Sequence, residues 1–153
     1  MNKNCIITGA TDGIGKQTAI DLARLGYRIG LVGRDLQKGE LVLNEIENAT
    51  NNQSLKYFRA DLSNIKSIER LSDEIKEEYD SVDILINNAG VSDPQRFKDL
   101  TEESWNYVLE TNLNGAFRMA KAVTDLFIED KKGGSIINIA SILGIRVGLN
   151  LTS

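Results

Sequence analysis

A glycine-rich segment near the start of the chain has the composition of a phosphate-binding loop. Residues 8–15 have the sequence TGATDGIG, which lies between a short apolar run and a segment of helical periodicity. Glycine lets the backbone turn sharply and bring N–H groups close to a pyrophosphate, and a helix that begins there attracts the anion. We expect cofactor contacts from Gly9, Thr11, Asp12, Gly13, Ile14 and Gly15. A packing turn without any ligand is the alternative interpretation.

Four further sites, each with at least one polar residue, follow predicted strands or lie in a predicted helix. Asp61 and Leu62 come directly after the third strand, and Asn87-Asn88-Ala89-Gly90 follows the fourth. Asn112 lies within a long helical pattern, and Ser141 follows the fifth strand. A carboxylate at Asp61 can accept a hydrogen bond from an adenine amine, or it can cap a helix. The amides after the fourth strand can satisfy backbone groups of the first strand and also border a ligand.

These motifs, in this order and spacing, resemble the short-chain dehydrogenase/reductase family over nearly the whole chain. The segments that carry the resemblance are TGATDGIG, Asp61-Leu62, NNAG (87–90), TNLNG (111–115) and IINIASILG (136–144). The resemblance implies a Rossmann-type NAD(P)-dependent oxidoreductase that transfers hydride between nicotinamide and a carbonyl or secondary alcohol. It assigns the glycine loop to the pyrophosphate, Asp61 and Leu62 to the adenine, and Asn88, Ala89 and Gly90 to the cofactor.

Arg34 bears on the choice of cofactor. NAD-selective Rossmann sites carry an acid after the second strand for the ribose hydroxyls, whereas this chain has Gly33 followed by Arg34. A guanidinium suits a 2′-phosphate, so NADP(H) is favoured over NAD(H). Asp12 argues in the other direction, since NADP-preferring relatives often have a basic residue there. A surface ion pair of Arg34 with Asp35 is the alternative.

The resemblance also implies a catalytic group of Asn, Ser, Tyr and Lys, of which two members have counterparts here. Asn112 matches the residue that holds a water in the proton relay, and Ser141 matches the one that binds the substrate oxygen. The Tyr-x-x-x-Lys motif is absent, because no lysine stands four residues after any of the four tyrosines.

We therefore expect residues 1–153 to be an NAD(P)-binding domain that is incomplete at its C-terminus, truncated before the last strands, and inactive alone. A non-catalytic nucleotide-binding or assembly module is the alternative. An S-adenosylmethionine methyltransferase would explain neither NNAG nor Arg34.

The composition excludes several other functions. The 153 residues carry 18 Lys and Arg against 22 Asp and Glu, a net charge of −4, which disfavours nucleic-acid binding and anionic membranes. The chain has no histidine and one cysteine, so a Ser-His-Asp triad, a His-ligated metal site and an internal disulfide are excluded. We expect no metal, no membrane span and a cytoplasmic location. The helical stretch 105–129 matches a dimer-contact helix of relatives, so we expect a homo-oligomer of the full-length form, with core packing as the alternative.

The elements that must position these residues alternate along the chain. Strands are predicted at 4–8, 29–32, 55–59, 82–86 and 135–140, and helices at 14–25, 36–48, from 61 and at 105–129, followed by a loop at 142–153. The first helix is expected to bury Ile14, Thr18, Leu22 and Leu25, and the third Ile65, Ile68, Leu71, Ser72 and Ile75. Strands separated by helices pair in parallel, so the fold class is α/β, a doubly wound sheet with five strands present and ligands at the carboxyl ends.

Overall fold

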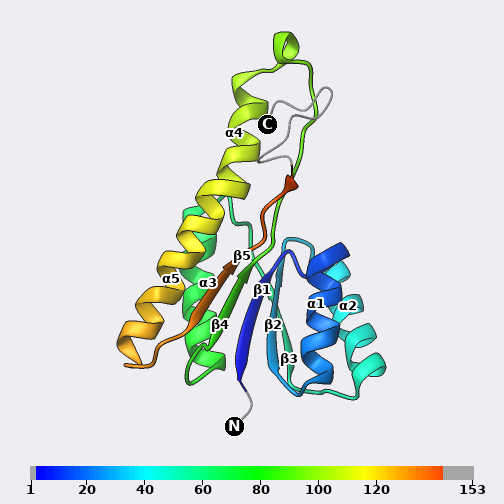
Figure 1. Ribbon diagram of the computed structural model, residues 1–153, viewed down its shortest axis with the longest axis vertical. Coiled ribbons are helices and arrows are strands. Elements are labelled where there is room, and N and C mark those ends of the chain that lie inside the picture. The colour runs from blue at the N-terminus through cyan, green and yellow to red at the C-terminus, as the bar shows by residue number, and fades with distance from the viewer. Residues whose placement is uncertain (1–2, 143–153) are drawn as a thin grey trace.

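The computed structural model describes residues 3–142, which form one parallel sheet flanked by helices (Figure 1). The strands are β1 (Asn4–Thr8), β2 (Arg28–Gly33), β3 (Leu55–Arg59), β4 (Ile84–Asn87) and β5 (Ser135–Asn138). Their order is β3-β2-β1-β4-β5, and all four pairings are parallel. The strand order reverses direction between β1 and β4, which is where ligands bind in sheets of this kind. The predicted fold class is therefore confirmed.

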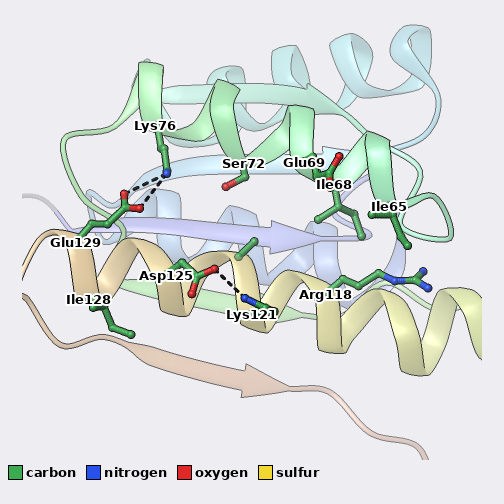
Figure 2. Close-up of a pocket in the computed structure, with 11 residues that line it drawn as sticks. Ile65, Ile68, Glu69, Ser72, Lys76, Arg118, Lys121, Asp125, Ile128 and Glu129 are labelled. Atoms are coloured by element: carbon green, nitrogen blue, oxygen red, sulfur yellow. Dashed lines mark hydrogen bonds and ion pairs between the residues drawn. The ribbon is translucent and has the colours of Figure 1, made fainter.

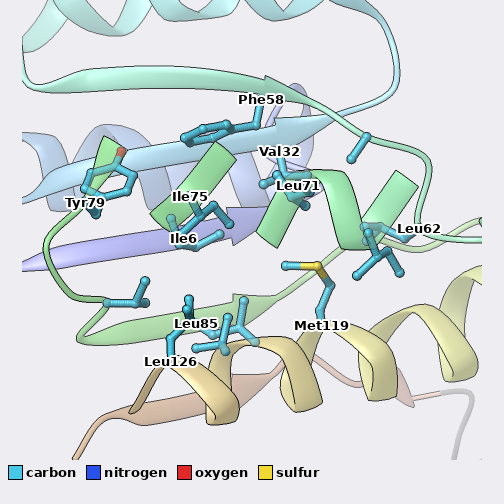
Figure 3. Close-up of a cluster of buried hydrophobic side chains, with 14 residues drawn as sticks. Ile6, Val32, Phe58, Leu62, Leu71, Ile75, Tyr79, Leu85, Met119 and Leu126 are labelled. Atoms are coloured by element: carbon cyan, nitrogen blue, oxygen red, sulfur yellow. The ribbon is translucent and has the colours of Figure 1, made fainter. Parts of the chain in front are cut away.

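The helices cover the two faces of the sheet. The elements are α1 (Gly13–Arg24), α2 (Leu36–Thr50), α3 (Ile65–Glu78), α4 (Glu102–Leu109) and α5 (Ala116–Glu129). Figure 1 shows α1 and α2 on one face and α3 and α5 on the other. Strand side chains alternate between two buried clusters: Ile6 and Leu85 pack under α3 and α5 (Figure 3), whereas Cys5 and Ile7 pack under α1 and α2.

The buried face of α1 differs from the prediction. Ile14 and Leu25 are 65% and 73% exposed, and the buried positions are Gly15, Ala19 and Ala23. The predicted buried stripe and the observed buried stripe are shifted by about one residue around the helix. Small side chains on the inner face let the helix backbone approach the sheet, so packing distance overrides the preference for burying the largest residues. The predicted helix end is confirmed, because Gly26 has φ +81°.

The boundaries of the later elements also differ. α3 begins at Ile65 with Asn64 as its N-cap, not at Asp61, and Ile65 is exposed where burial was expected. β4 begins two residues later than predicted, and β5 ends two residues earlier.

The predicted continuous helix 105–129 begins at Glu102 and is interrupted by a π-helical turn, Glu110–Gly115. Within this turn Glu110 accepts hydrogen bonds from Asn114 and from Arg118, which stabilise the wide turn from the side.

One expectation falls almost wholly outside the described part of the chain. The predicted loop 142–153 lies beyond it except for Ile142. Within residues 3–142, no helix combines the length and the apolar character needed to cross a membrane.

Candidate functional site

The glycine loop is folded tightly against the end of β4. Gly9 has φ +65°, and a Cβ there would come within 2.7 Å of Ala89 Cα. A Cβ on Gly15 would come within 2.4 Å of both the Gly9 carbonyl oxygen and Asn88 Nδ2. Gly13 has φ +50°, but no atom lies within 4 Å of its Cβ position. The packing interpretation therefore accounts for Gly9 and Gly15, whereas Gly13 faces open space.

Asn88 joins the carboxyl ends of β1 and β4. Its Nδ2 donates to the carbonyl oxygens of Thr8 and Gly9, both at 3.1 Å. In return Thr8 Oγ1 accepts from the N–H groups of Asn88 and Ala89, both at 3.0 Å. The prediction that amides of this segment satisfy first-strand backbone groups is confirmed for Asn88, whereas Asn87 Nδ2 donates to the Ala116 carbonyl and to Asn138 Oδ1. These bonds of Asn88 and Ala89 fasten the start of the glycine loop to the end of β4, at the point where the sheet order reverses.

A hollow of about 330 Å³, which we call the first hollow, lies beside this junction. It gathers seven of the predicted cofactor residues: Gly9, Thr11, Asp12, Arg34, Leu62, Ala89 and Gly90. Gly13, Ile14 and Gly15 form the first turn of α1 next to it, while Asp61 and Asn88 are not on its wall. Its other lining residues, which the sequence did not single out, are Val32, Gly33, Lys38, Ala60, Val91 and Thr111. Lys38 could have been found as the basic residue in the helical turn that follows Arg34.

The charges around the first hollow are organised by the starts of α1 and α2. Asp12 caps α1, with Oδ1 accepting from Gly13 N at 2.8 Å, and its Oδ2 lies 2.7 Å from Lys38 Nζ. The hydrogen bond from Lys38 and the one from Gly13 N hold the pKa of Asp12 below its usual value. Asp35 caps α2 by accepting from Lys38 N at 3.0 Å. Within residues 3–142 no ion pair joins Arg34 to Asp35, although Arg34 is exposed as the surface alternative expected.

Asp61 stabilises a turn and does not cap a helix. Its Oδ1 accepts from the N–H and the hydroxyl of Ser63, at 3.0 and 2.7 Å, while Asn64 provides the cap of α3. The capping alternative is therefore wrong. The turn presents Leu62 toward the hollow.

A second hollow of about 390 Å³ lies between the ends of β4 and β5 and the side of α5. Leu62 and Ala89 line both hollows, so the two are neighbours across the end of β4. Most of its wall is apolar, with polar atoms from three asparagines and Thr8. The lining residues are Thr8, Leu62, Asn87, Ala89, Asn112, Leu113, Ala116, Phe117, Ala120, Asn138, Ile139 and Ala140.

The two predicted catalytic residues are placed differently. Asn112 is on the wall of the second hollow, and its side chain exchanges two hydrogen bonds of 2.8 Å with the N–H and carbonyl of Val91. It thereby holds the segment that follows Gly90. Ser141 lies beyond β5 and is exposed, next to Ala140 of the same wall.

None of the tyrosines in the described residues lines either hollow. Tyr57 donates to the Asp35 carbonyl, and burial together with the Asp35 charge raises its pKa to about 12. Burial and the Glu78 charge likewise raise the pKa of Tyr79. A proton donor at neutral pH is more efficient when its pKa lies near the operating pH, so neither phenol suits that role.

A larger hollow, of about 580 Å³, lies between α3 and α5 and contains no predicted site residue (Figure 2). Figure 2 shows two ion pairs on its wall, one between Lys76 and Glu129 and one between Lys121 and Asp125. Its size alone therefore does not make it the functional site.

The first and second hollows fit an elongated dinucleotide. The first turn of α1 has no acidic residue, although Asp12 caps the helix, and the space around the Gly13 Cβ position is open. A Cβ on Gly90 would meet only Asn112, at 3.6 Å, so the space in front of this glycine is not needed for packing. Basic groups border the first hollow, and the second is mainly apolar. The first hollow therefore suits the phosphate-rich half of a dinucleotide, and the second suits its flat, less charged half.

Comparisons with known proteins agree with this geometry. The sequence profile of the short chain dehydrogenase family matches residues 3–153. A 3-oxoacyl-[acyl-carrier-protein] reductase of Staphylococcus epidermidis is 33% identical over 145 residues, which is 94% of this chain and 58% of the relative. A 3beta-hydroxysteroid dehydrogenase of Mediterraneibacter gnavus is 32% identical, over 94% of this chain and 51% of the relative.

Solved structures show the same likeness. An F189W variant of actinorhodin polyketide ketoreductase with NADPH superposes with a TM-score of 0.92 and 32% identity, covering 98% of this chain and 57% of that one. An alcohol dehydrogenase from the archaeon Thermococcus sibiricus, complexed with 5-hydroxy-NADP, gives a TM-score of 0.87 and 31% identity, covering 96% and 61%. The chain thus spans somewhat more than half the length of these relatives. With the family profile matched almost from end to end and the sheet order, glycine loop and β1–β4 junction in place, the chain belongs to the short-chain dehydrogenase/reductase family.

Proposed function

We propose that residues 1–153 form the NADP(H)-binding part of a reductase or dehydrogenase that acts on a small carbonyl or secondary-alcohol compound. The observation that carries this proposal is the first hollow. It brings the glycine loop, Arg34 and the residues after β4 together at the point where the sheet order reverses. The NADPH and 5-hydroxy-NADP named with two similar structures support the choice of cofactor.

Each part of the two hollows has a proposed role. The open backbone at Gly13 and the start of α1 bind the pyrophosphate, and Arg34 binds the 2′-phosphate through charge-assisted hydrogen bonds. Asp61 and Leu62 border the adenine, and Ala89 and Gly90 leave room for the middle of the cofactor. When bound, the nicotinamide supplies the hydride.

The second hollow receives the nicotinamide end and the substrate. Asn112 fixes the segment after Gly90 through its bonds to Val91, and Ser141 donates a hydrogen bond to the substrate oxygen. No tyrosine of the chain is followed by lysine at the fourth position, and none in the described residues lines these hollows. We propose that the 153-residue chain binds the cofactor without turning over a substrate, and that the full-length form is a homo-oligomer.

The test is calorimetric titration of the chain with NADPH and with NADH. Hydrogen bonds to charged groups contribute about 1.5–3 kcal/mol, so Arg34→Ala should weaken NADPH binding by roughly 10- to 150-fold. NADH binding should hardly change. Absence of binding by either nucleotide would reject the proposed function, and equal losses for both would reject the role of Arg34.

Turnover is measured separately, as NADPH oxidation with several ketones. We expect none, because general acid–base catalysis usually contributes about 10²- to 10⁴-fold in rate and, within residues 3–142, no tyrosine lines the two hollows. Measurable turnover by the 153-residue chain would contradict this part of the proposal and would favour an enzyme over a binding module.

A further inference from the structure

We propose that Lys38 is, beside Arg34, a second cation that determines specificity for the 2′-phosphate. It acts by cancelling the negative charge of Asp12. This inference rests on the proposed NADP(H) site. It concerns a residue that the sequence did not single out and an acid that, taken alone, argues against a phosphate at this place.

The geometry puts three charged side chains on one wall. Asp12, Arg34 and Lys38 all line the first hollow, although the acid belongs to the start of α1 and the two bases follow β2. Lys38 Nζ lies 2.7 Å from Asp12 Oδ2. The lysine side chain is 47% exposed and that of Asp12 is 82% exposed, so both remain accessible to a ligand.

The backbone that carries Lys38 is firmly held. Asp35 caps α2 through Lys38 N, and the Asp35 carbonyl accepts from the Tyr57 hydroxyl at 2.8 Å. The Tyr57 ring lies flat against Gly39, where a Cβ would come within 2.2 Å of the ring. These contacts fix the first turn of α2, while the flexible stem of Lys38 leaves its ammonium free to adjust.

The charges of Asp12, Arg34 and Lys38 determine whether this wall attracts or repels a phosphate. An isolated Asp12 carboxylate would repel a phosphate at this wall, whereas the Asp12–Lys38 pair is neutral and leaves the charge of Arg34 to attract it. An ammonium has three donors, so Lys38 can keep its bond to Asp12 and donate to a phosphate at the same time. The neighbouring Lys16 is already paired with Glu45.

The pair contributes little to folding. Ion pairs between exposed side chains contribute little to protein stability, so substitutions here should leave the fold intact. Effects on nucleotide binding can therefore be measured without loss of structure. Asn caps a helix about as well as Asp, so Asp12→Asn removes the charge and keeps the bond to Gly13 N.

The experiment compares calorimetric affinities for adenosine 2′,5′-bisphosphate and 5′-AMP, which differ by the 2′-phosphate. Lys38→Met keeps most of the stem and removes the charge. We expect it to weaken the bisphosphate by roughly 10-fold or more, because hydrogen bonds to charged groups contribute about 1.5–3 kcal/mol, and to leave 5′-AMP unchanged. Lys121→Met, which breaks an ion pair with Asp125 on α5, is the matched control and should change neither affinity.

A double-mutant cycle tests whether Lys38 acts through Asp12. In the Lys38→Met background, Asp12→Asn should recover several-fold of the lost bisphosphate affinity, because the uncancelled carboxylate is removed. In the wild-type background the same substitution should have a clearly smaller effect. Equal effects in both backgrounds, or a Lys38→Met variant with an unchanged ratio of the two affinities, would overturn the inference. A wild-type chain that binds neither nucleotide would instead reject the proposed function.

Discussion

The two hollows on either side of β4 are built differently. The first is bordered by β1 and β2, whose residues are almost all buried, and its polar groups are held by helix caps and by Asn88. The second is bordered by β5, whose four residues are all exposed, and by the apolar side chains of Leu113 and Phe117. The first hollow therefore owes its shape to packing on both faces of the sheet. Substitutions of the buried strand residues that border the first hollow should act through the fold, whereas those at the second hollow, and at the exposed Arg34 and Lys38, should act mainly on what binds.

Truncation of one isoleucine on each side of β4 gives the largest expected contrast in stability. Ile7 in β1 is fully buried, whereas Ile137 in β5 is 44% exposed. Ile7→Ala should lower the free energy of unfolding by about 2–5 kcal/mol, because it removes buried methyl groups and leaves a cavity. Ile137→Ala should cost less than about 1.5 kcal/mol, since much of its surface stays in water. Urea unfolding followed by circular dichroism measures both. Similar losses would show that the two sides are equally packed.

Two glycines make the distinction between packing and open space at the first hollow itself, because Gly90 lines it and Gly15 lies next to it in the first turn of α1. A Cβ at Gly15 would collide with backbone and with Asn88, whereas at Gly90 it would make an ordinary contact with Asn112. Gly15→Ala should destabilise the fold by about 1–3 kcal/mol, as overpacking does. Gly90→Ala should leave the unfolding midpoint nearly unchanged and weaken NADPH binding, if the open space in front of Gly90 receives the cofactor as we propose. A Gly90→Ala chain that unfolds as readily as Gly15→Ala would assign Gly90 to packing.

Tyr57, which packs beside the first hollow, gives the smallest expected effect and the most local one. Its folded pKa is raised from 10 to about 12. The unfolded phenol loses its proton near pH 10, so the stability that this group contributes is complete below that pH and is lost as the pH rises toward 12. Urea midpoints measured between pH 9 and 11 should therefore fall with rising pH, and less steeply in Tyr57→Phe. Parallel slopes for the two proteins would mean that other groups cause the loss.

Some features of the fold and the site could be predicted from the sequence, and others could not. Each strand–loop–helix unit is local, so the β-branched runs, the glycine loop and the helix end at Gly26 were visible in the sequence. Parallel pairing with right-handed crossovers then brought the glycine loop and NNAG to one edge of the sheet. Seven of the twelve predicted cofactor residues consequently lie on one hollow.

Only the tertiary structure decided how individual side chains are used. The inner face of α1 is the row of Gly15 and Ala19, because close approach to the sheet favours small residues over the larger Ile14. The pairing of Asp12 with Lys38 joins residues from two helices, and no local periodicity encodes it. Asn112 turned out to hold Val91, a partner that depends on the π-helical turn. The sequence by itself determined the order of the elements and the edge at which they meet, since these follow from local propensity and chain connectivity. The partners of each polar group depend on distances between separate elements, which only the packed structure sets.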